Sequence, residues 1–429
     1  MDRNAPRREC NMKNELLQVL YERGFLYQSI HEEALNVLCS KGPVSFYWGC
    51  DATADSLHVG NLMGIMVARW FQDMHHRPIL LVGGGTTAIG DPAYRTTGRT
   101  PMTSEHIQEN IKGIQYSLEK SISFTGTHAA KLVNNADWLN HLSYIPFLRE
   151  IGSHFSVHRM LGFEMLKTRL EGNLPLSFSE LNYMVLQAYD FLHLYREEGC
   201  VLQLGGSDQW GNLVCGVDLI RRIEGAEVSA LTWPLLTTAN GAKMGKSAQG
   251  AVWLDERKTS PYAYWQFWRN SDDRDVFRFL KLYTQLPLSE ITALEKAGTE
   301  ALKDAKLKLA DEATAFLHGR DVLPSIHHTV RHVFGDQQRE IMLDDPLQLP
   351  SIELLTLDEK GILVLEALER LGFITSRREG RQKIREGAVR LEGNSVSDEL
   401  MRLHAHDFQE KSVLQLSLGA KKHGLIRLT

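Results

Sequence analysis

Short apolar runs alternate with longer amphipathic segments along the first half of the chain. Apolar runs of this length are typical of buried strands, and we expect strands over residues 45–50, 78–82, 131–133, 200–204 and 231–236. The amphipathic segments predict helices over residues 57–71, 144–151, 178–195 and 211–223. Strands that alternate with helices favour an α/β fold with a parallel sheet, in which ligands bind at the carboxyl ends of the strands.

The pattern becomes helical near Ser260 and Pro261 and changes again before the last part of the chain. There, residues 362–371 predict an amphipathic helix, and Ser376 with Glu379 predicts a capping box that opens a second helix. We therefore expect an α/β domain over residues 1–258 with an N-terminal helix and a helical insertion, an α-helical domain over 259–340, a linker over 341–358 and a small α+β domain over 359–429.

Composition is that of an ordinary globular protein, since 43% of the 429 residues are hydrophobic and 24% are charged, with a net charge of −5. From Gly361 to the end, however, 12 Lys and Arg stand against 9 Asp and Glu. The last domain is thus the basic part of an acidic protein. If the chain binds nucleic acid, it must do so through such local basic patches.

The five cysteines are scattered and include no C-x-x-C pair, which argues against a disulfide framework and a structural zinc site and favours a reducing compartment. The paired histidines lack partners at ligand spacing, so we expect them on the surface and predict no metal site.

No apolar run approaches the ~18 residues of a membrane helix. Residues 1–11 carry arginines but no apolar stretch, and their acidic residues disfavour an organellar transit segment. We expect a disordered leader and a cytoplasmic protein.

A first candidate motif lies where the first predicted strand ends and a helix begins, at His58, Val59, Gly60 and Asn61. The N-terminus of a helix offers free N–H groups to a phosphate. A histidine there can donate to a phosphoryl oxygen, and a glycine lets a purine ring approach the backbone. The alternative is a helix-capping region with a packed histidine, and the motif alone does not decide between them.

A second candidate motif, Lys243-Met-Gly-Lys-Ser247, follows a predicted strand and a turn at Asn240 and Gly241. Two lysines three residues apart on a glycine-bearing loop can close on a polyphosphate as flexible point charges. The alternative is an exposed basic loop. The two motifs, about 185 residues apart and in this order, resemble the HIGH and KMSKS signatures of class I aminoacyl-tRNA synthetases, from which Asn61 and Gly245 depart.

Three polar residues, Tyr183, Gln187 and Asp190, share one face of the helix predicted over residues 178–195. They either face solvent or line a polar pocket, and their apolar neighbours favour the pocket. This stretch resembles the tyrosine-pocket helix of tyrosyl-tRNA synthetases. Further loops resemble that family, of bacterial and mitochondrial type, in order and spacing over nearly the whole chain; they lie at residues 47–49, 83–85, 90–92 and 205–212.

The resemblance implies a Rossmann-like catalytic domain and a tyrosine–tRNA ligase, which forms tyrosyl-adenylate from L-tyrosine and ATP and transfers the tyrosyl group to tRNA(Tyr). It implies catalytic roles for Thr53, His58, Arg99, Lys243 and Lys246. It assigns tyrosine to Tyr47, Asp91, Tyr183, Gln187, Asp190, Gln203 and Gln209. It assigns ATP to Gly49, Asp51, His58, Gly60, Asn61, Gly206, Asp208, Leu235, Leu236 and Lys246. Magnesium should arrive with ATP, and the family is a homodimer.

Two further expectations concern specificity and RNA. Pockets that hydrogen-bond a hydroxyl reject the analogue without it, and since tyrosyl-tRNA synthetases are themselves the standard example, we expect no editing domain.

The last domain resembles a small RNA-binding fold shared with a ribosomal small-subunit protein. Its residues Arg378, Arg381 and Arg385 share a helix face that either binds RNA or is merely solvated.

The chain departs from the family on a loop that in the family approaches the phosphates. Ala93 and Tyr94 replace its usual Ser-Gly, which leaves the role of Arg95 open. The alternatives to a tyrosine–tRNA ligase are a tryptophan-specific relative, a synthetase repurposed as a structural RNA-binding protein, and a small nucleotidyltransferase. Tyr47 and Asp190 favour tyrosine over tryptophan, because a phenol needs both and an indole has no such hydroxyl.

Overall fold

The computed structural model describes residues 14–91, 102–241, 244–247, 250–334, 349–354, 360–408, 412–419 and 422–428. Its chain divides into two compact units, Met1–Lys246 with Ala251–Asp255 and Ser271–Leu309, and Ser247–Gly250 with Glu256–Asn270 and Ala310–Thr429. The predicted leader, Arg95, Arg99 and Lys243 lie outside the described residues, as does most of the predicted linker.

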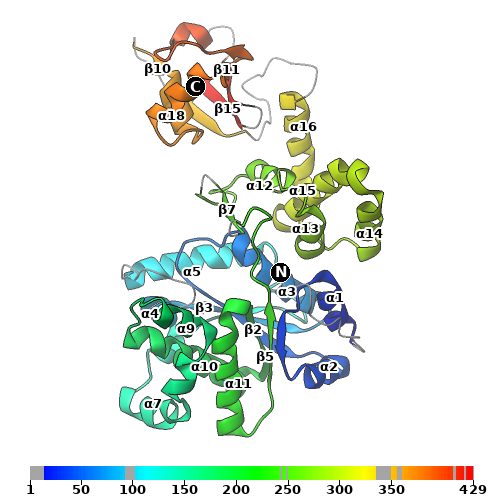
Figure 1. Ribbon diagram of the computed structural model, residues 1–429, viewed down its shortest axis with the longest axis vertical. Coiled ribbons are helices and arrows are strands. Elements are labelled where there is room, and N and C mark those ends of the chain that lie inside the picture. Colours follow the sequence, from blue (N-terminus) through cyan, green and yellow to red (C-terminus); the bar gives the residue numbers. More distant parts are fainter. Residues whose placement is uncertain are drawn as a thin grey trace. The chain divides into compact units, whose positions relative to one another are not determined.

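A six-stranded sheet in the order β1-β6-β5-β2-β3-β4 forms the centre of the first unit (Figure 1). Its strands are β1 (Gln28–Ile30), β2 (Ser45–Asp51), β3 (Arg77–Gly83), β4 (Lys131–Asn134), β5 (Cys200–Gly206) and β6 (Ser229–Trp233). All neighbours are parallel except β1, which pairs antiparallel with β6. The α/β fold with a parallel core is thus confirmed, with one antiparallel edge.

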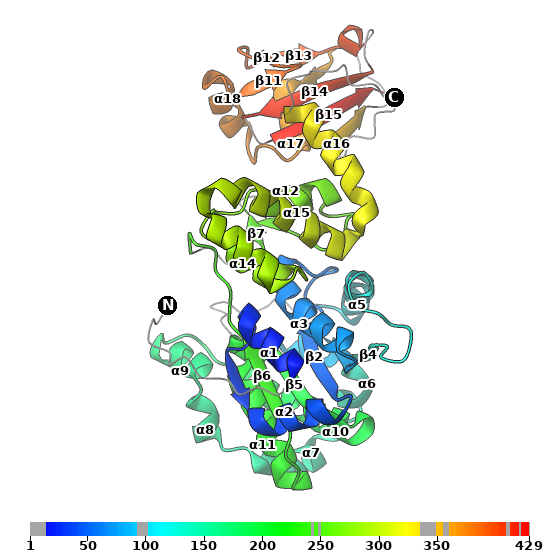
Figure 2. The ribbon, with the colours of Figure 1, turned by 90° about the vertical axis from the view of Figure 1, so that its right-hand side faces the viewer.

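Helices cover both faces of this sheet, and the alternation of side chains along β2 shows how. Phe46 contacts Phe71 of α3 (Leu62–Asp73), with ring centroids 4.7 Å apart, whereas the next residue, Tyr47, contacts Phe191 of α10 (Phe178–Glu198) at 5.5 Å. Successive strand residues point to opposite faces, so α3 and α10 lie on opposite sides. Helix α11 (Trp210–Glu224) lies beside α10 (Figure 1), and α1 (Glu15–Arg23) packs on α3 (Figure 2).

The other helices of the first unit lie in connections or follow the sheet. They are α2 (Glu32–Lys41), α4 (Gly84–Ile89), α5 (Ser104–Glu119), α6 (Ala136–Leu139), α7 (Tyr144–Glu150), α8 (Val157–Leu161), α9 (Glu164–Glu171), α13 (Val276–Tyr283) and α14 (Leu288–Ala297). Helix α15 (Leu302–His318) and the short strand β7 (Lys246–Ser247) begin in this unit and end in the other, whereas the short strand β8 (Gly250–Ala251) begins in the other unit and ends in this one.

Two element predictions are wrong at their ends, for local reasons. The strand predicted to residue 236 ends at Trp233, because Pro234 has no N–H to donate to a ladder. The helix predicted from residue 57 begins only at Leu62, after a 3₁₀ turn over Val59–Asn61. His58 caps that turn with extended backbone, so it cannot be helical itself.

The second unit contains α12 (Pro261–Arg269), α16 (Leu323–Phe334) and, near the end of the chain, a five-stranded sheet with two helices. That sheet has the order β12-β11-β14-β15-β9, from β9 (Ser351–Leu354), β11 (Val389–Leu391), β12 (Asn394–Ser395), β14 (Val413–Leu418) and β15 (Lys422–Leu428). Helices α17 (Val364–Arg370) and α18 (Arg377–Arg385) share its apolar core, and β10 (Ile362–Leu363) pairs with β13 (Arg402–Leu403).

Two predictions for this last part of the chain are wrong in detail. The helix predicted from residue 362 begins at Val364, because Ile362 and Leu363 pair with a strand. The capping box is only half formed: Ser376 accepts from the Glu379 N–H, but the Glu379 carboxylate accepts from the N–H and hydroxyl of Thr375 instead.

Candidate active site at the carboxyl ends of the central strands

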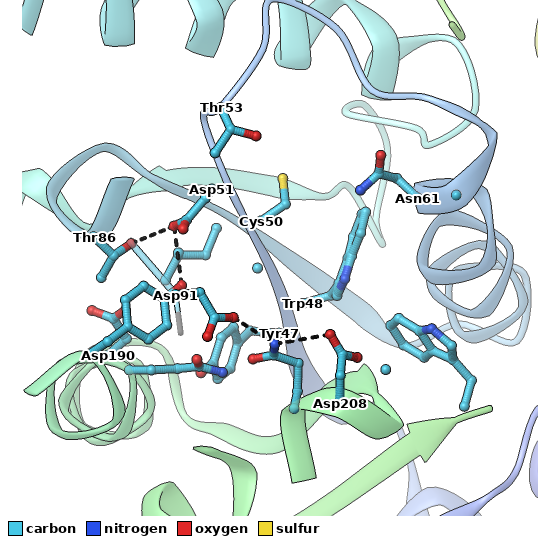
Figure 3. Close-up of a pocket in the computed structure, with 18 of the residues that line it drawn as sticks. Tyr47, Trp48, Cys50, Asp51, Thr53, Asn61, Thr86, Asp91, Asp190 and Asp208 are labelled. Atoms are coloured by element: carbon cyan, nitrogen blue, oxygen red, sulfur yellow. Dashed lines mark hydrogen bonds between the residues drawn. The ribbon is translucent and has the colours of Figure 1, made fainter. Parts of the chain in front are cut away.

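A cavity of about 330 Å³ opens where β2 and β5 end, and Figure 3 shows residues that line it. By the strand order, the chain connections leave the sheet in opposite directions at this point. Residues predicted from the sequence supply most of its lining: Tyr47, Gly49, Asp51, Thr53, Gly60, Asn61, Asp91, Tyr183, Gln187, Asp190, Gly206, Asp208, Gln209 and Leu235. Trp48, Cys50, Leu81, Thr86 and Trp233 line it as well and were not predicted. The three polar residues of α10 therefore face a pocket rather than solvent.

One end of the cavity is built from Tyr47 and Asp190, each 2% exposed. The Tyr47 hydroxyl is buried and has no hydrogen-bond partner among the described residues. Asp190 accepts from Trp138 Nε1 at 2.8 Å and from Asn135 Nδ2 at 3.0 Å. A buried hydroxyl without a partner is costly in an interior. Together with the neighbouring carboxylate, it forms a site that fits a ligand hydroxyl.

Burial dominates the electrostatics of this end. It raises the pKa of Asp190 to about 7, although the hydrogen bonds from Asn135 and Trp138 act in the opposite direction. It also raises the pKa of Tyr47 well above its ordinary value, and the Asp190 charge adds to that shift. Tyr47 therefore keeps its proton at neutral pH, whereas Asp190 changes its charge near pH 7.

A chain of hydrogen bonds runs from Asp190 across the cavity wall. Asn135 donates to both Asp190 and Thr86, whose hydroxyl donates to Asp51 Oδ1 at 2.9 Å. The Thr86–Asp51 bond is drawn in Figure 3, and the Tyr183 hydroxyl donates to the same Asp51 oxygen at 3.2 Å. The sequence analysis assigned Asp51 to ATP and Tyr183 to tyrosine. The residues predicted for the two ligands therefore meet at the Asp51 carboxylate.

A second chain connects the polar residues of α10 and α11. Gln209 donates to Asp91 Oδ2 at 2.8 Å, and Asn212 donates to the side-chain oxygens of both Gln209 and Gln187 at 2.9 Å. Gln203 does not line the cavity; it lies beside Tyr47 in the sheet and is 1% exposed. Asn212, which is fully buried, orders the amides and was not predicted because it looks like any polar helix residue.

His58 lies beside the cavity and not in its lining. Its Nδ1 accepts from the Gly60 N–H at 2.9 Å, and Asn61 Oδ1 accepts from the His58 N–H at 3.1 Å. The capping role that the sequence left open is thus confirmed. A Cβ at Gly60 would stand 2.5 Å from the His58 ring and 3.1 Å from the Met244 carbonyl. The glycine is therefore needed for contacts within the chain itself, whatever its role toward a ligand.

The two sequence motifs meet in the fold. Gly245 has φ +87°, and a Cβ there would stand 2.5 Å from the Gly60 backbone nitrogen. Its carbonyl accepts from the Val252 N–H at 3.0 Å, and the Val59 N–H donates to the Val252 carbonyl at 2.9 Å. Lys243 lies outside the described residues, and the structure describes no side chain for Lys246. Leu236, predicted near adenine, does not line the cavity.

The predicted basic face lies on α18 in the second unit. This helix buries Gly380 and Ile384 and exposes Arg378, Arg381 and Arg385. Glu399 pairs with two of these, Arg385 at 2.5 Å and Arg381 at 3.8 Å. The face is thus partly neutralised, and at exposed sites such pairs are weak enough to exchange for other anions.

No group of three or more His, Cys, Asp or Glu side chains among the described residues is arranged to hold a metal ion. No helix among them is long and apolar enough to cross a membrane.

Comparison with known proteins places this cavity in context. Residues 40–335 match the family model of tRNA synthetases class I (W and Y). The tyrosine–tRNA ligase of Rhodospirillum rubrum is 48% identical over 417 residues, which cover 97% of this chain and 98% of that protein; that of Paracoccus denitrificans is 46% identical over 422 residues, covering 97% and 99%. The truncated mitochondrial tyrosyl-tRNA synthetase of Aspergillus nidulans superposes with a TM-score of 0.67 at 30% identity, over 74% of this chain and 94% of that one.

Proposed function

This chain belongs to the tyrosine–tRNA ligase family of class I synthetases, and we propose from this premise that it activates L-tyrosine with ATP and transfers the tyrosyl group to the 3′-terminal adenosine of tRNA(Tyr). One observation carries the choice of amino acid. The buried Tyr47 hydroxyl has no partner among the described residues and stands beside the buried carboxylate of Asp190. A phenolic hydroxyl satisfies both at once, by accepting from one and donating to the other.

The rest of the cavity suits the amino-acid end of the ligand. Asp91, Tyr183 and Gln187 line it and, in this proposal, hold the ammonium group, with Gln209 tying Asp91 in place. Gln203 supports the pocket from behind Tyr47. A tryptophan-specific relative is disfavoured, because an indole cannot accept a hydrogen bond from Tyr47 in the plane where a phenol oxygen does.

ATP is proposed to occupy the part of the cavity toward Asn61 and Asp208 (Figure 3). Gly49, Asp51, Gly60, Asn61, Gly206 and Asp208 would surround the adenosine, with Leu235 and Leu236 near adenine. Thr53 and His58 would act on the phosphates, and Arg99, Lys243 and Lys246 on the departing pyrophosphate. Magnesium, which neutralises phosphate charge, would enter with ATP, since its usual sites combine phosphates with few protein ligands.

The reaction then follows by positioning and charge stabilisation. A tyrosine carboxylate oxygen attacks the α-phosphorus, the bond to the β-phosphate oxygen breaks, and pyrophosphate leaves with that electron pair. A ribose hydroxyl of tRNA next attacks the tyrosyl carbonyl, and AMP leaves. The chain's own residues contribute orientation and preorganised charge, and none of them becomes covalently modified.

Exchange of radioactive pyrophosphate into ATP tests the proposal directly. We expect exchange with tyrosine and none with tryptophan or phenylalanine. Exchange with tryptophan alone would overturn the choice of amino acid. If no amino acid supported exchange, the chain would be a repurposed synthetase with another role.

Gly245→Ala is expected to lower this exchange about 10- to 100-fold, because a Cβ there enters the space of the Gly60 backbone and also strains φ. Gly241→Ala is the matched control: its φ is +79° and nothing lies within 4 Å of a Cβ. Equal losses in the two variants would attribute the effect to backbone strain alone.

The small basic domain is proposed to bind tRNA and to have the fold seen in a ribosomal small-subunit protein. Its closed apolar core and exposed arginine face support this, as does the positive charge of its sequence. The division into residues 1–258, 259–340, 341–358 and 359–429 is part of the same proposal.

Arg378→Glu with Arg381→Glu is expected to weaken tRNA charging about 10- to 100-fold at low salt and to spare exchange, because lost phosphate contacts act only on the RNA. Arg370→Glu, on the neighbouring helix α17 and paired with Glu366, is the control. Charging and exchange should be measured on the same preparations; a parallel fall of both would make the face structural.

A homodimer in the cytoplasm completes the proposal. Five large apolar side chains between residues 144 and 178 are well exposed, as an interface with a second copy requires: Tyr144, Ile145, Val157, Leu170 and Phe178. Sedimentation at micromolar concentration should show a dimer, and a monomer there would contradict it. The unpaired cysteines Cys39, Cys50, Cys200 and Cys215 favour a reducing compartment.

A further inference from the structure

The segment that leads from β6 to Lys243 is held by the start of α13, far along the chain. Asp275 is the N-cap residue of α13, but its side chain makes no capping hydrogen bond to a backbone N–H of that helix. Aspartate at an N-cap normally accepts from an N–H of the first helical turn. Here Oδ2 accepts from the Ala239 N–H at 2.7 Å instead. Asp275 therefore uses its carboxylate for a contact with a distant segment of the chain and not for capping its own helix.

Arg278, one turn further along α13, makes a second connection to the same segment. Its guanidinium donates to the Thr237 carbonyl at 2.7 Å and to Asp275 Oδ1 at 2.6 Å. Arg274 adds a third, by donating to Asn240 Oδ1 at 2.7 Å. Asp275 and Arg278 thus form an ion pair whose two members each hold one backbone group of the segment. We call these two residues the α13 clamp.

Because Asp275 is buried, the clamp tolerates little change in the positions of its hydrogen-bond partners. Asp275 is 3% exposed, and a carboxylate that deep must be paired and hydrogen-bonded. Moving Ala239 away would leave the carboxylate with one partner and would leave a backbone N–H unsatisfied. Arg274 is mostly exposed by comparison, so we give it a minor part.

The clamped residues stand directly before the lysine motif. The Met244 N–H donates to the Leu236 carbonyl at 3.2 Å, and the Gly241 N–H donates to the Thr238 carbonyl at 2.8 Å. Met244 therefore lies beside Leu236. The clamp binds Thr237 and Ala239, which follow Leu236, and Gly245, which follows Met244, contacts Gly60.

We propose that Asp275 and Arg278 are positioning residues for adenylate formation, which act by fixing Thr237 and Ala239 shortly before the motif whose lysines, Lys243 and Lys246, would reach the pyrophosphate. This rests on the proposed function of those lysines. A lysine acts as a point charge on a flexible stem, so only its backbone can be positioned by the fold. Displacements of about 1 Å can cost as much as 100-fold in rate.

Kinetics of pyrophosphate exchange in the full-length protein test the clamp. Asp275→Ala and Arg278→Gln should each lower kcat about 10- to 100-fold, as expected for loss of a buried charge-assisted hydrogen bond. The KM for tyrosine should stay within about twofold, because the clamp does not touch the tyrosine end of the cavity. Asp275→Asn, which keeps an oxygen for the Ala239 N–H, should recover part of the loss.

Lys281→Gln is the matched control, since Lys281 lies on the same helix and pairs with Glu295. It should leave kcat unchanged. The proposal would be overturned if the Asp275 and Arg278 variants kept the wild-type kcat. It would also be overturned if the KM for tyrosine rose by as large a factor as kcat fell and the melting temperature fell as well.

Limited trypsin digestion of the same proteins gives a readout that does not need activity. Loss of the clamp should speed cleavage after Lys243 and Lys246 about tenfold, because local opening exposes the backbone to the protease. Unchanged cleavage would overturn the clamp. If the wild-type protein showed no exchange with tyrosine, the proposed function would fail while this digestion still decided whether the clamp exists.

Discussion

Asp190→Asn is expected to lower kcat/KM for tyrosine in pyrophosphate exchange by about 10²- to 10³-fold, the effect of removing one partner from a buried, charged hydrogen-bond pair. The reason lies in its neighbours. Asn135 and Trp138 both donate to Asp190. An amide has only one acceptor oxygen, so its NH₂ group must face either one of these donors or the ligand hydroxyl.

The same variant is expected to be more stable than the wild type at alkaline pH. The pKa of Asp190 is raised from 3.8 to about 7 by burial, so between about pH 4 and 7 the folded state holds a proton that the unfolded state has lost. Stability from this group therefore falls as pH rises through that window, by at most about 4 kcal/mol. Asparagine does not titrate and escapes the loss.

Urea unfolding at pH 5 and pH 8 checks this, with Glu197→Gln as an exposed control on the same helix. The advantage of Asp190→Asn should be larger at pH 8 than at pH 5. An advantage that does not depend on pH, or an unchanged kcat/KM, would refute the assignment of Asp190 as a buried, ionisable ligand of the phenol.

Asn135→Ala is expected to lower exchange about 10- to 100-fold at pH 7 and to recover part of it at pH 9. Asn135 is fully buried and donates to Asp190, and this hydrogen bond lowers the pKa of Asp190. Without it the pKa of Asp190 rises, so less of the carboxylate is ionised at pH 7. Activity should therefore rise with pH in both proteins, with a higher midpoint in the variant.

A pH profile of kcat/KM for tyrosine measures this midpoint. Asn140→Ala, at the exposed end of the same short helix α6, is the control and should keep the wild-type profile. A loss of equal size at every pH would mean that the pocket has collapsed, and it would contradict a role through the charge of Asp190.

Much of the site could be predicted because its signals are local. Tyr183, Gln187 and Asp190 share a helix face by spacing alone, and Ser177 with Glu180 closes the capping box that starts this helix. Glycine runs after strands marked the loops around the cavity. The helix start near His58 was wrong, because the side chains of His58 and Asn61 compete with helical backbone in a way that periodicity does not detect.

Other residues gave no signal that a single sequence could reveal. Asn135 and Trp138 follow a short strand and resemble any polar loop, yet they hold Asp190 because β4 ends beside β3 in the sheet. Asp275 would be taken for an ordinary helix cap, and only the structure shows that it binds the Ala239 N–H. Such contacts depend on the order of strands and on helix packing, which are not periodic properties of the chain.

The sequence by itself, together with its resemblance to a known family, predicted the chemistry of this protein: motifs for a nucleotide, a polar helix face for a hydroxylated amino acid and a basic end for RNA. The motifs and the shared helix face are patterns over a few residues, and the resemblance assigns their ligands. Only the tertiary structure decided which polar groups pair, that Asp51 accepts hydrogen bonds from both Thr86 and Tyr183 and that Asp275 of α13 binds the Ala239 N–H. Those pairings join residues tens to hundreds of positions apart, because burial forces each polar group to find a partner wherever the fold brings one.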